Sequence, residues 1–146
     1  SRYNRDEAAK VLSVVNDLLA PGDLQPEDIG VISPYNGQVR ELVRLFELAG
    51  GREVGQPYAG LEVKSVDGYQ GREKEVIVFS TVRANERGEV GFLADHRRLN
   101  VAITRAKRGL VLLGHPITLR HDGTWKSYLD WVDEHQLFAW HVTHSA

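Results

Sequence analysis

Hydrophobic residues recur at helical spacing in two stretches near the start of the chain. In residues 8–19 they lie three and four positions apart, and Pro21-Gly22 interrupts the pattern. Residues 4–7 have the form of a capping box, because Asn4 is followed three positions later by Glu7. The second stretch covers residues 37–48, and the terminator Gly50-Gly51 follows it. The pattern therefore predicts two amphipathic helices.

Four shorter segments predict strands. They are residues 29–33, 61–66, 76–82 and 110–114, and the first lacks polar alternation, so we expect it to be buried on both faces. A further helical pattern covers residues 125–135, ahead of an aromatic-rich tail. Strands that alternate with helices favour an α/β fold with a mostly parallel sheet flanked by helices on both sides. We expect residues 1–146 to form one such domain.

Residues 97–108 differ from the rest of the chain in charge. They hold five cations and no acid, whereas the whole chain has a formal net charge of −2. Leu99, Ile103 and Ala106 are spaced as on one face of a helix, and Arg98 and Arg105 lie two turns apart at the rim of that face. The segment therefore predicts a helix whose rim arginines reach a bound anion. A solvated basic face is the alternative, because runs of charge usually face water.

Composition narrows the class of protein. With 42% hydrophobic and 26% charged residues, the 146-residue chain is typical of one globular domain with its own core. It has no cysteine, which excludes disulfides and thiolate zinc sites, and its six histidines form no His-x-x-x-His pair, so we predict no metal site. No hydrophobic run approaches the roughly 20 residues that cross a membrane. The chain has no methionine and starts at Ser1, so we expect it to be a fragment of a longer protein.

Three polar turns are expected at one edge of the sheet. In parallel sheets ligands bind outside the carboxyl ends of the strands, and this rule selects residues 33–38, 65–73 and 80–85. The hydroxyl, amide and glycine residues of the first two turns suit phosphate or sugar binding, although a plain helix cap and a glycine-rich connection also explain them. The basic segment precedes a strand, so the rule does not place it relative to this edge.

The sequence gives little support for a metal-dependent nuclease or for a P-loop of its own. Glu62-Val63-Lys64 matches the Glu-x-Lys of metal-dependent nucleases, in which alternate side chains of a strand share one face, but the match needs a partner aspartate. No Gly-x-x-x-x-Gly-Lys-Ser/Thr sequence is present, so the glycine turn at residues 67–73 is not a P-loop. The polar turns and the basic segment taken together point to a class of protein more specifically than the three-residue Glu-x-Lys match does.

Three segments together resemble the motifs of superfamily 1 helicases. Residues 32–38 resemble motif IV, residues 63–74 resemble motif V and residues 97–107 resemble motif VI, and they occur in that order. Val82-Arg83-Ala84-Asn85 and Gly91-Phe92-Leu93 are similar to the up-frameshift helicases of nonsense-mediated mRNA decay and to the immunoglobulin-mu-binding helicases. The sequence departs from that pattern in small ways, with Gly68-Tyr69 in place of Ala/Gly-Phe and Lys107 where arginine is common.

The resemblance implies the second of two RecA-like domains of an ATP-dependent 5′-to-3′ RNA/DNA helicase. In that family ATP and Mg²⁺ lie between the two domains, and Arg105 would be the arginine finger on the γ-phosphate. The residues implied to bind ATP are Gln70, Gly71, Glu73, Arg98 and Arg105. The residues implied to line the path of single-stranded RNA or DNA are Ser33, Pro34, Tyr35 and Ser65.

The same resemblance limits what the chain is expected to do alone. It lacks the Walker A sequence and an Asp-Glu pair on a predicted strand, so we expect that it neither hydrolyses ATP nor unwinds nucleic acid by itself. The implied partners are the first RecA-like domain of the same protein and mRNA-decay factors, with no membrane, in the cytoplasm or the nucleus and with the cytoplasm favoured. The alternative is a nucleic-acid- or protein-interaction domain that keeps the fold without motor activity.

Overall fold

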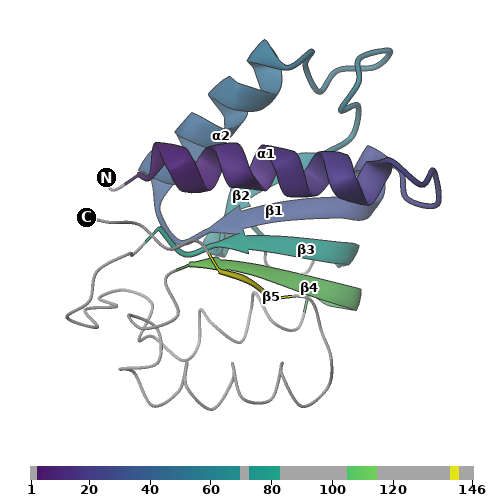
Figure 1. The fold of residues 1–146 in the computed structure, drawn as a ribbon. Helices are drawn as coiled ribbons and strands as arrows, with labels where there is room; N and C mark the ends of the chain where they lie inside the picture. The colour runs from purple at the N-terminus through teal and green to yellow at the C-terminus, as the bar shows by residue number, and fades with distance from the viewer. Residues whose placement is uncertain (1–2, 70–72, 83–104, 115–138, 142–146) are drawn as a thin grey trace.

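A five-stranded parallel sheet forms the centre of the molecule (Figure 1). The computed structural model describes residues 3–69, 73–82, 105–114 and 139–141. The strands are β1 (Ile29–Ser33), β2 (Glu62–Ser65), β3 (Lys74–Ser80), β4 (Ala106–Gly114) and β5 (Ala139–His141), in the order β2-β1-β3-β4-β5. Each of the four pairings is parallel, which confirms the predicted α/β class.

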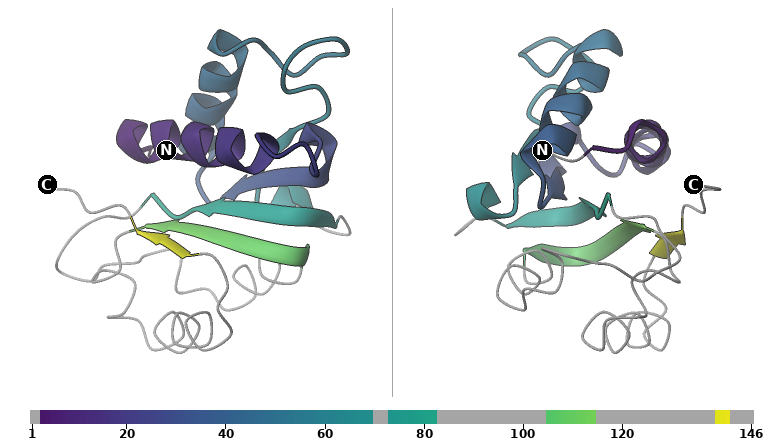
Figure 2. Two further views of the ribbon diagram at one scale, coloured as in Figure 1. Left: turned by 45° about the vertical axis from the view of Figure 1, so that its right-hand side comes forward. Right: turned by 90° about the vertical axis from the view of Figure 1, so that its left-hand side faces the viewer.

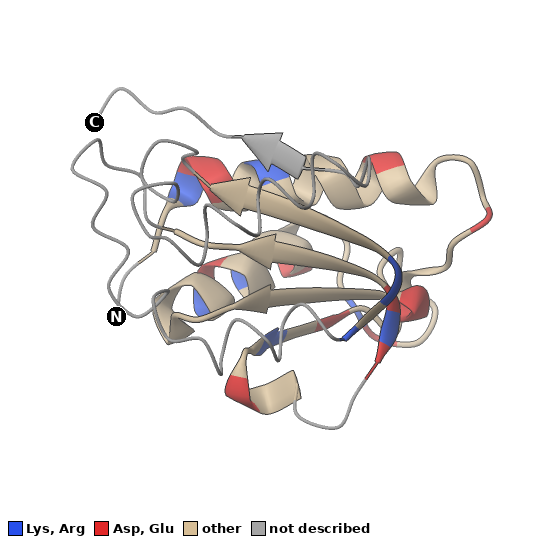
Figure 3. Ribbon diagram, turned by 90° about the horizontal axis from the view of Figure 1, so that it is seen from below, with Lys and Arg blue, Asp and Glu red and all other residues tan. Residues whose placement is uncertain are grey.

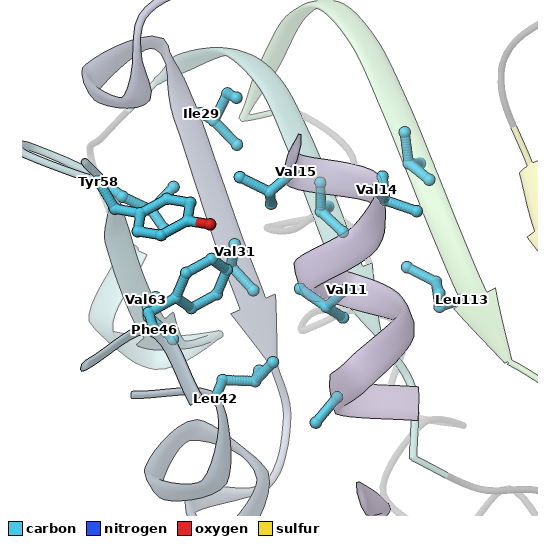
Figure 4. Close-up of a cluster of buried hydrophobic side chains, with 14 of the residues drawn as sticks. Val11, Val14, Val15, Ile29, Val31, Leu42, Phe46, Tyr58, Val63 and Leu113 are labelled. Carbon is cyan, nitrogen blue, oxygen red and sulfur yellow. The ribbon is translucent and has the colours of Figure 1, made fainter. Parts of the chain in front are cut away.

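Two α-helices lie on the same face of this sheet (Figure 2). α1 (Arg5–Leu19) contacts β3 and β4, and α2 (Asn36–Leu48) contacts β1 and β2. The apolar side chains between helices and sheet form a continuous core, in which Phe46 and Tyr58 meet edge to face with ring centroids 5.0 Å apart (Figure 4). Burying a side chain of this size contributes about 1.5–3 kcal/mol, so the layer stabilises the positions of both helices. Neither described helix is long and apolar enough to span a membrane.

The helix ends lie close to where the sequence predicts them. The Asn4 side chain accepts a hydrogen bond of 2.9 Å from the Glu7 N–H, as an N-cap does. Gly50 and Gly51 follow α2 with φ of 137° and 96°, values that favour glycine. The predicted capping box is only half formed, because the Glu7 side chain turns away from the helix end and is buried. Two 3-10 turns, Pro26–Asp28 and Asp67–Tyr69, precede β1 and follow β2.

The largest error of the sequence prediction concerns the start of β4. The strand begins at Ala106, so the predicted helix is wrong for residues 105–108. Ala106 pairs with Lys74 of β3, and this ladder between strands outweighs the local helical spacing of the apolar residues. Residues 97–104 of the predicted basic helix and the predicted helix at 125–135 lie outside the described residues. The pattern does not predict β5, which is three residues long at the edge of the sheet.

Candidate functional site

The residues expected to contact nucleic acid lie together at the carboxyl edge of the sheet. Ser33 and Ser65 end the neighbouring strands β1 and β2 and are paired in register. The Ser33 hydroxyl accepts a hydrogen bond from the Tyr35 N–H at 3.3 Å, and the Ser65 hydroxyl accepts one from the Gly68 N–H at 3.3 Å. Both serines therefore brace the turns that follow their strands. Ser33 is fully buried, whereas Pro34, Tyr35 and Ser65 are partly exposed at this edge.

A buried polar network lies behind this edge and joins three elements. The Glu7 carboxylate of α1 accepts hydrogen bonds from the Ser80 hydroxyl of β3 at 2.5 Å and from the Val82 N–H at 2.9 Å. The Gln38 amide of α2 donates to the same Ser80 hydroxyl at 3.1 Å. Val82 has a φ of 71°, which is unusual for a β-branched residue, and the Glu7 hydrogen bond holds its backbone there. The network therefore fixes the direction in which the chain leaves β3.

Burial dominates the chemistry of Glu7. Desolvation raises the pKa of the Glu7 carboxyl from 4.5 to about 7, against the lowering effect of its hydrogen bonds from Ser80 and Val82. Its second carboxylate oxygen, Oε2, is buried and has no hydrogen-bond partner among the residues that the structure describes. The sequence pattern predicts Glu7 only as part of a local helix cap. No local signal reveals the network, because its partners lie more than seventy positions away along the chain.

Glu73 and Arg105 lie on the opposite, amino edge of the sheet. Glu73 directly precedes β3 and Arg105 directly precedes β4, and these two strands are paired through Lys74 and Ala106. The Lys74 N–H donates to the Arg105 carbonyl oxygen at 2.9 Å, so the backbones next to the two side chains are joined. The carboxyl-edge rule grouped residues 65–73 at one edge, and for Glu73 that assignment is wrong. Ser65 lies at the carboxyl edge of the sheet and Glu73 at the amino edge, so the chain changes edges between these two residues.

The charges around Arg105 distinguish it from its neighbours. In Figure 3 the charged parts of the central strands lie at their amino ends. Arg108 pairs with Glu75 at 2.6 Å, and Lys74 pairs with Glu62 at 3.2 Å. Arg105, in contrast, forms no ion pair within the described part of the chain, and its Nε is buried without a hydrogen-bond partner. A guanidinium with an unused buried donor is suited to an incoming anion such as a phosphate oxygen.

A β-bulge beside Arg105 shapes the same edge. The register between β3 and β4 shifts between Lys74 and Val76, so that Lys74 faces Ala106 while Val76 faces Gly109. Bulges of this kind are common next to functional sites because they redirect side chains at the strand end. Gln70, Gly71 and Arg98, the other residues expected to bind ATP, lie outside the described residues.

The described residues offer little support for a metal site of their own. In residues 3–69, 73–82, 105–114 and 139–141, no group of three or more His, Cys, Asp or Glu is arranged to hold a metal ion. Glu62, the acid of the nuclease-like Glu-x-Lys match, lies 3.2 Å from the Lys74 ammonium and 3.7 Å from that of Lys64. Glu62 is thus neutralised by lysines, which disfavours the nuclease alternative. A magnesium ion next to Arg105 would need ligands from elsewhere.

Known proteins resemble the chain over most of its length. Residues 1–117 match a family model described as an AAA domain. The chain is 42% identical over 139 residues to a Regulator of nonsense transcripts 1 homolog of Drosophila melanogaster, an alignment that covers 95% of the chain and 12% of the relative. It is 45% identical over 129 residues to ATP-dependent helicase NAM7 of Saccharomyces cerevisiae, which covers 88% of the chain and 13% of the relative.

A third relative has a name that refers to DNA rather than to RNA transcripts. It is DNA polymerase alpha-associated DNA helicase A of Saccharomyces cerevisiae, which is 44% identical over 138 residues, 92% of the chain and 19% of the relative. The chain therefore spans less than a fifth of the length of these three relatives. The similarity covers both the carboxyl-edge and the amino-edge residues described above.

Proposed function

The chain belongs to the AAA domain family and, within it, to the superfamily 1 helicases of the up-frameshift type, and on that premise we propose that it is the second RecA-like motor domain of an ATP-dependent 5′-to-3′ RNA/DNA helicase. In this proposal its amino edge completes an ATP site shared with a first RecA-like domain, and its carboxyl edge lines the path of the single strand. The observation that carries the proposal is the position of Arg105 beside Glu73, with a buried donor that no described residue satisfies.

The proposed chemistry assigns a separate task to each residue of the amino edge. ATP with Mg²⁺ supplies the phosphoryl group that is transferred to water. Arg105 contributes a guanidinium that neutralises the charge spread over the phosphoryl oxygens, an effect worth roughly 10³–10⁵ in rate where such fingers have been measured. Glu73 accepts a hydrogen bond from a ribose hydroxyl, and Gln70, Gly71 and Arg98 complete the contacts to the nucleotide.

The proposal also assigns a limit to the chain. The 146 residues contain no Gly-x-x-x-x-Gly-Lys-Ser/Thr sequence, so the groups that hold the β-phosphate and the metal ion come from the first domain. The isolated chain is therefore inactive in ATP hydrolysis and in unwinding. mRNA-decay factors are further proposed partners of the whole protein. Robust ATPase activity of the purified 146-residue chain would contradict this limit.

The decisive experiment replaces Arg105 in the whole protein with its first domain present. We expect Arg105→Ala to lower nucleic-acid-stimulated kcat by roughly 10³-fold or more while nucleotide binding is largely kept, because the finger acts on charge that develops during transfer. Arg108→Ala is the matched control, since Arg108 lies at the same edge but is paired with Glu75 and is 70% exposed. Its turnover is expected within about 2-fold of the unmodified protein.

The same experiment distinguishes the alternative of an interaction domain without motor activity. Turnover that is unchanged in Arg105→Ala would refute the finger assignment and favour that alternative. A loss of nucleotide binding equal to the loss of turnover would instead assign Arg105 to ground-state binding. The measurements required are steady-state hydrolysis and equilibrium binding of a non-hydrolysable ATP analogue.

A further inference from the structure

A hollow of about 270 Å³ opens between the start of α1 and the first nine residues of α2. Its lining residues are Tyr3, Arg5, Gly37, Arg40, Glu41 and Arg44. The four α2 residues are spaced by three and four positions, so they form one stripe along the helix. Tyr3 and Arg5 face this stripe from the N-terminal end of the chain. None of the six belongs to the residues assigned above to ATP or to the single strand.

The hollow is basic in a chain whose net charge is negative. Three arginines and one glutamate line it, whereas the whole chain has a formal net charge of −2. The charge of Glu41 is compensated by Arg44, because the Arg44 guanidinium donates to both carboxylate oxygens of Glu41 at 2.6 and 3.1 Å. The Arg44 hydrogen bond, together with the charges of Arg44 and Arg5, holds the pKa of the Glu41 carboxyl below its usual value. Arg5 and Arg40 therefore provide an excess of two positive charges.

An exposed aromatic ring lies at the rim of the same hollow. Tyr3 is 54% exposed, one of three large hydrophobic residues exposed in the described part of the chain. The Arg5 guanidinium lies over its ring, 5.7 Å from the centroid. Aromatic rings next to arginines are the combination that proteins use for single-stranded nucleic acids, because bases stack on the ring while phosphates meet the cations.

The N-terminal side of the hollow is held in place by hydrogen bonds. Asn4, which lies between Tyr3 and Arg5, donates from its N–H to the Gln38 Oε1 at 2.8 Å and accepts from the Gln38 Nε2 at 3.1 Å. Gln38 directly follows Gly37 of the hollow, and it bonds Ser80 at the carboxyl end of β3. The hollow is therefore preformed at the carboxyl edge, a few residues beyond the turn at residues 33–35. In Figure 1 the N-terminal end of α1 lies at the end of the sheet that carries the strand arrowheads.

We propose that this hollow binds one nucleotide unit of the single strand, with Arg5 and Arg40 on its phosphates and Tyr3 stacked on its base. The inference rests on the proposed function, because it extends the strand path from Tyr35 across the start of α2. RNA and DNA share the phosphate and base chemistry that the hollow recognises. An acidic peptide would use the arginines but would leave the exposed ring of Tyr3 without a stacking partner.

The test measures binding by the 146-residue chain itself, with fluorescently labelled 12-mers of oligo-U and oligo-dT. We expect Arg40→Ala to weaken binding roughly 5- to 10-fold and to reduce the salt dependence by about one phosphate contact. Tyr3→Ala should weaken binding at least about 5-fold, whereas Tyr3→Phe keeps the stacking surface and should remain within about 2-fold. Arg108→Ala is the control, because it removes the same charge from the opposite edge of the sheet.

Each result either supports or overturns the binding of a nucleotide unit in the hollow. Equal effects of Arg40→Ala and Arg108→Ala on the affinity for the 12-mers would overturn the proposal. Displacement of the 12-mers by an equimolar polyaspartate peptide would overturn it as well. Equal affinity for oligo-U and oligo-dT supports recognition of the shared backbone and bases, and tighter oligo-U binding supports an additional contact to the ribose 2′-hydroxyl. Unchanged circular dichroism of each variant shows that the helices remain folded.

The outcomes also separate this proposal from the proposed function. If Tyr35→Ala weakens binding while the Arg40 and Tyr3 variants do not, the hollow is refuted and the strand path stands. If the unmodified chain binds neither oligonucleotide, both the hollow and the path are refuted as sites of this chain. The motor assignment is then still decided by turnover of Arg105→Ala in the whole protein.

Discussion

Gly30 leaves the space that the Tyr69 side chain fills on the face of the sheet that points away from the two helices. The Tyr69 side chain is fully buried, and its hydroxyl donates to the Glu62 carbonyl oxygen at 3.0 Å. A Cβ on Gly30 would collide with that hydroxyl and would lie 2.9 Å from the Ile77 side chain. The Tyr69 that departs from the helicase pattern is therefore accommodated by a glycine on the neighbouring strand. Its extra hydroxyl group is satisfied rather than left buried without a partner.

Substitutions of this pair test the match. We expect Gly30→Ala to lower the free energy of unfolding by about 1–3 kcal/mol through overpacking, and Tyr69→Phe to lower it by about 1 kcal/mol through the lost hydrogen bond. In the double variant the loss of unfolding free energy should be smaller than the sum of the two single losses. The reason is that phenylalanine removes the hydroxyl that the new methyl group meets first. Urea denaturation of the four proteins measures the coupling. Additive costs would show that the collision is relieved in another way.

Among the elements, α1 and β3 are tied together by a buried carboxyl group rather than by apolar contact alone. Glu7 is the only acid among the fully buried side chains of the described residues, and it joins the first turn of α1 to Ser80 and to the Val82 backbone. The raised pKa of Glu7 means that the folded state holds a proton more tightly than the unfolded chain does. Stability from this group is therefore present at acidic pH and is lost as the pH rises from 4.5 to about 7.

The pH dependence of stability is the expected signature of Glu7. A shift of this size corresponds to about 3 kcal/mol between the two ends of that window. Glu7→Gln should remove this part of the dependence and should be more stable than the unmodified chain at pH 8, since glutamine keeps an oxygen that accepts from Ser80 and Val82. Asp17→Asn on the exposed side of α1 serves as the control. Urea denaturation between pH 4.5 and pH 8 measures the difference, and identical slopes for Glu7→Gln and the unmodified chain would contradict the assignment.

Elements with strong local signals were predictable from the sequence, and those set by pairing across the sheet were not. The helix α1 has an Asx cap and a clear apolar stripe, and β1 is a continuous apolar run that is buried at all five positions. The start of β4 was mispredicted because Ala106 continues the helical spacing of Leu99 and Ile103, while its actual partner is Lys74. The role of Glu7 was missed for the same reason, since its partners are distant in sequence.

Across the whole molecule, the candidate sites lie on opposite edges of one sheet. Ser33, Tyr35 and Ser65 lie at the carboxyl edge, whereas Glu73 and Arg105 lie at the amino edge. The motifs on their own did not predict this separation, because the position of Arg105 depends on where β4 begins. The seven residues of β3 set a distance of roughly 20 Å between the edges. At that distance, direct effects of one site on the affinity of the other should be small.

The separation predicts that substitutions at the two edges affect different binding constants. In the whole protein without nucleotide, Tyr35→Ala should weaken single-strand binding at least about 5-fold if a base stacks on its ring, whereas Arg105→Ala should change it less than about 2-fold. Turnover with saturating nucleic acid should show the reverse order, because only Arg105 acts on the transferring phosphoryl group. Fluorescence anisotropy and steady-state hydrolysis of the two single variants and the double variant measure both quantities. If Arg105→Ala weakened nucleotide-free strand binding as much as Tyr35→Ala does, Arg105 would belong to the strand path, and the division of the sheet into a nucleotide edge and a nucleic-acid edge would be wrong.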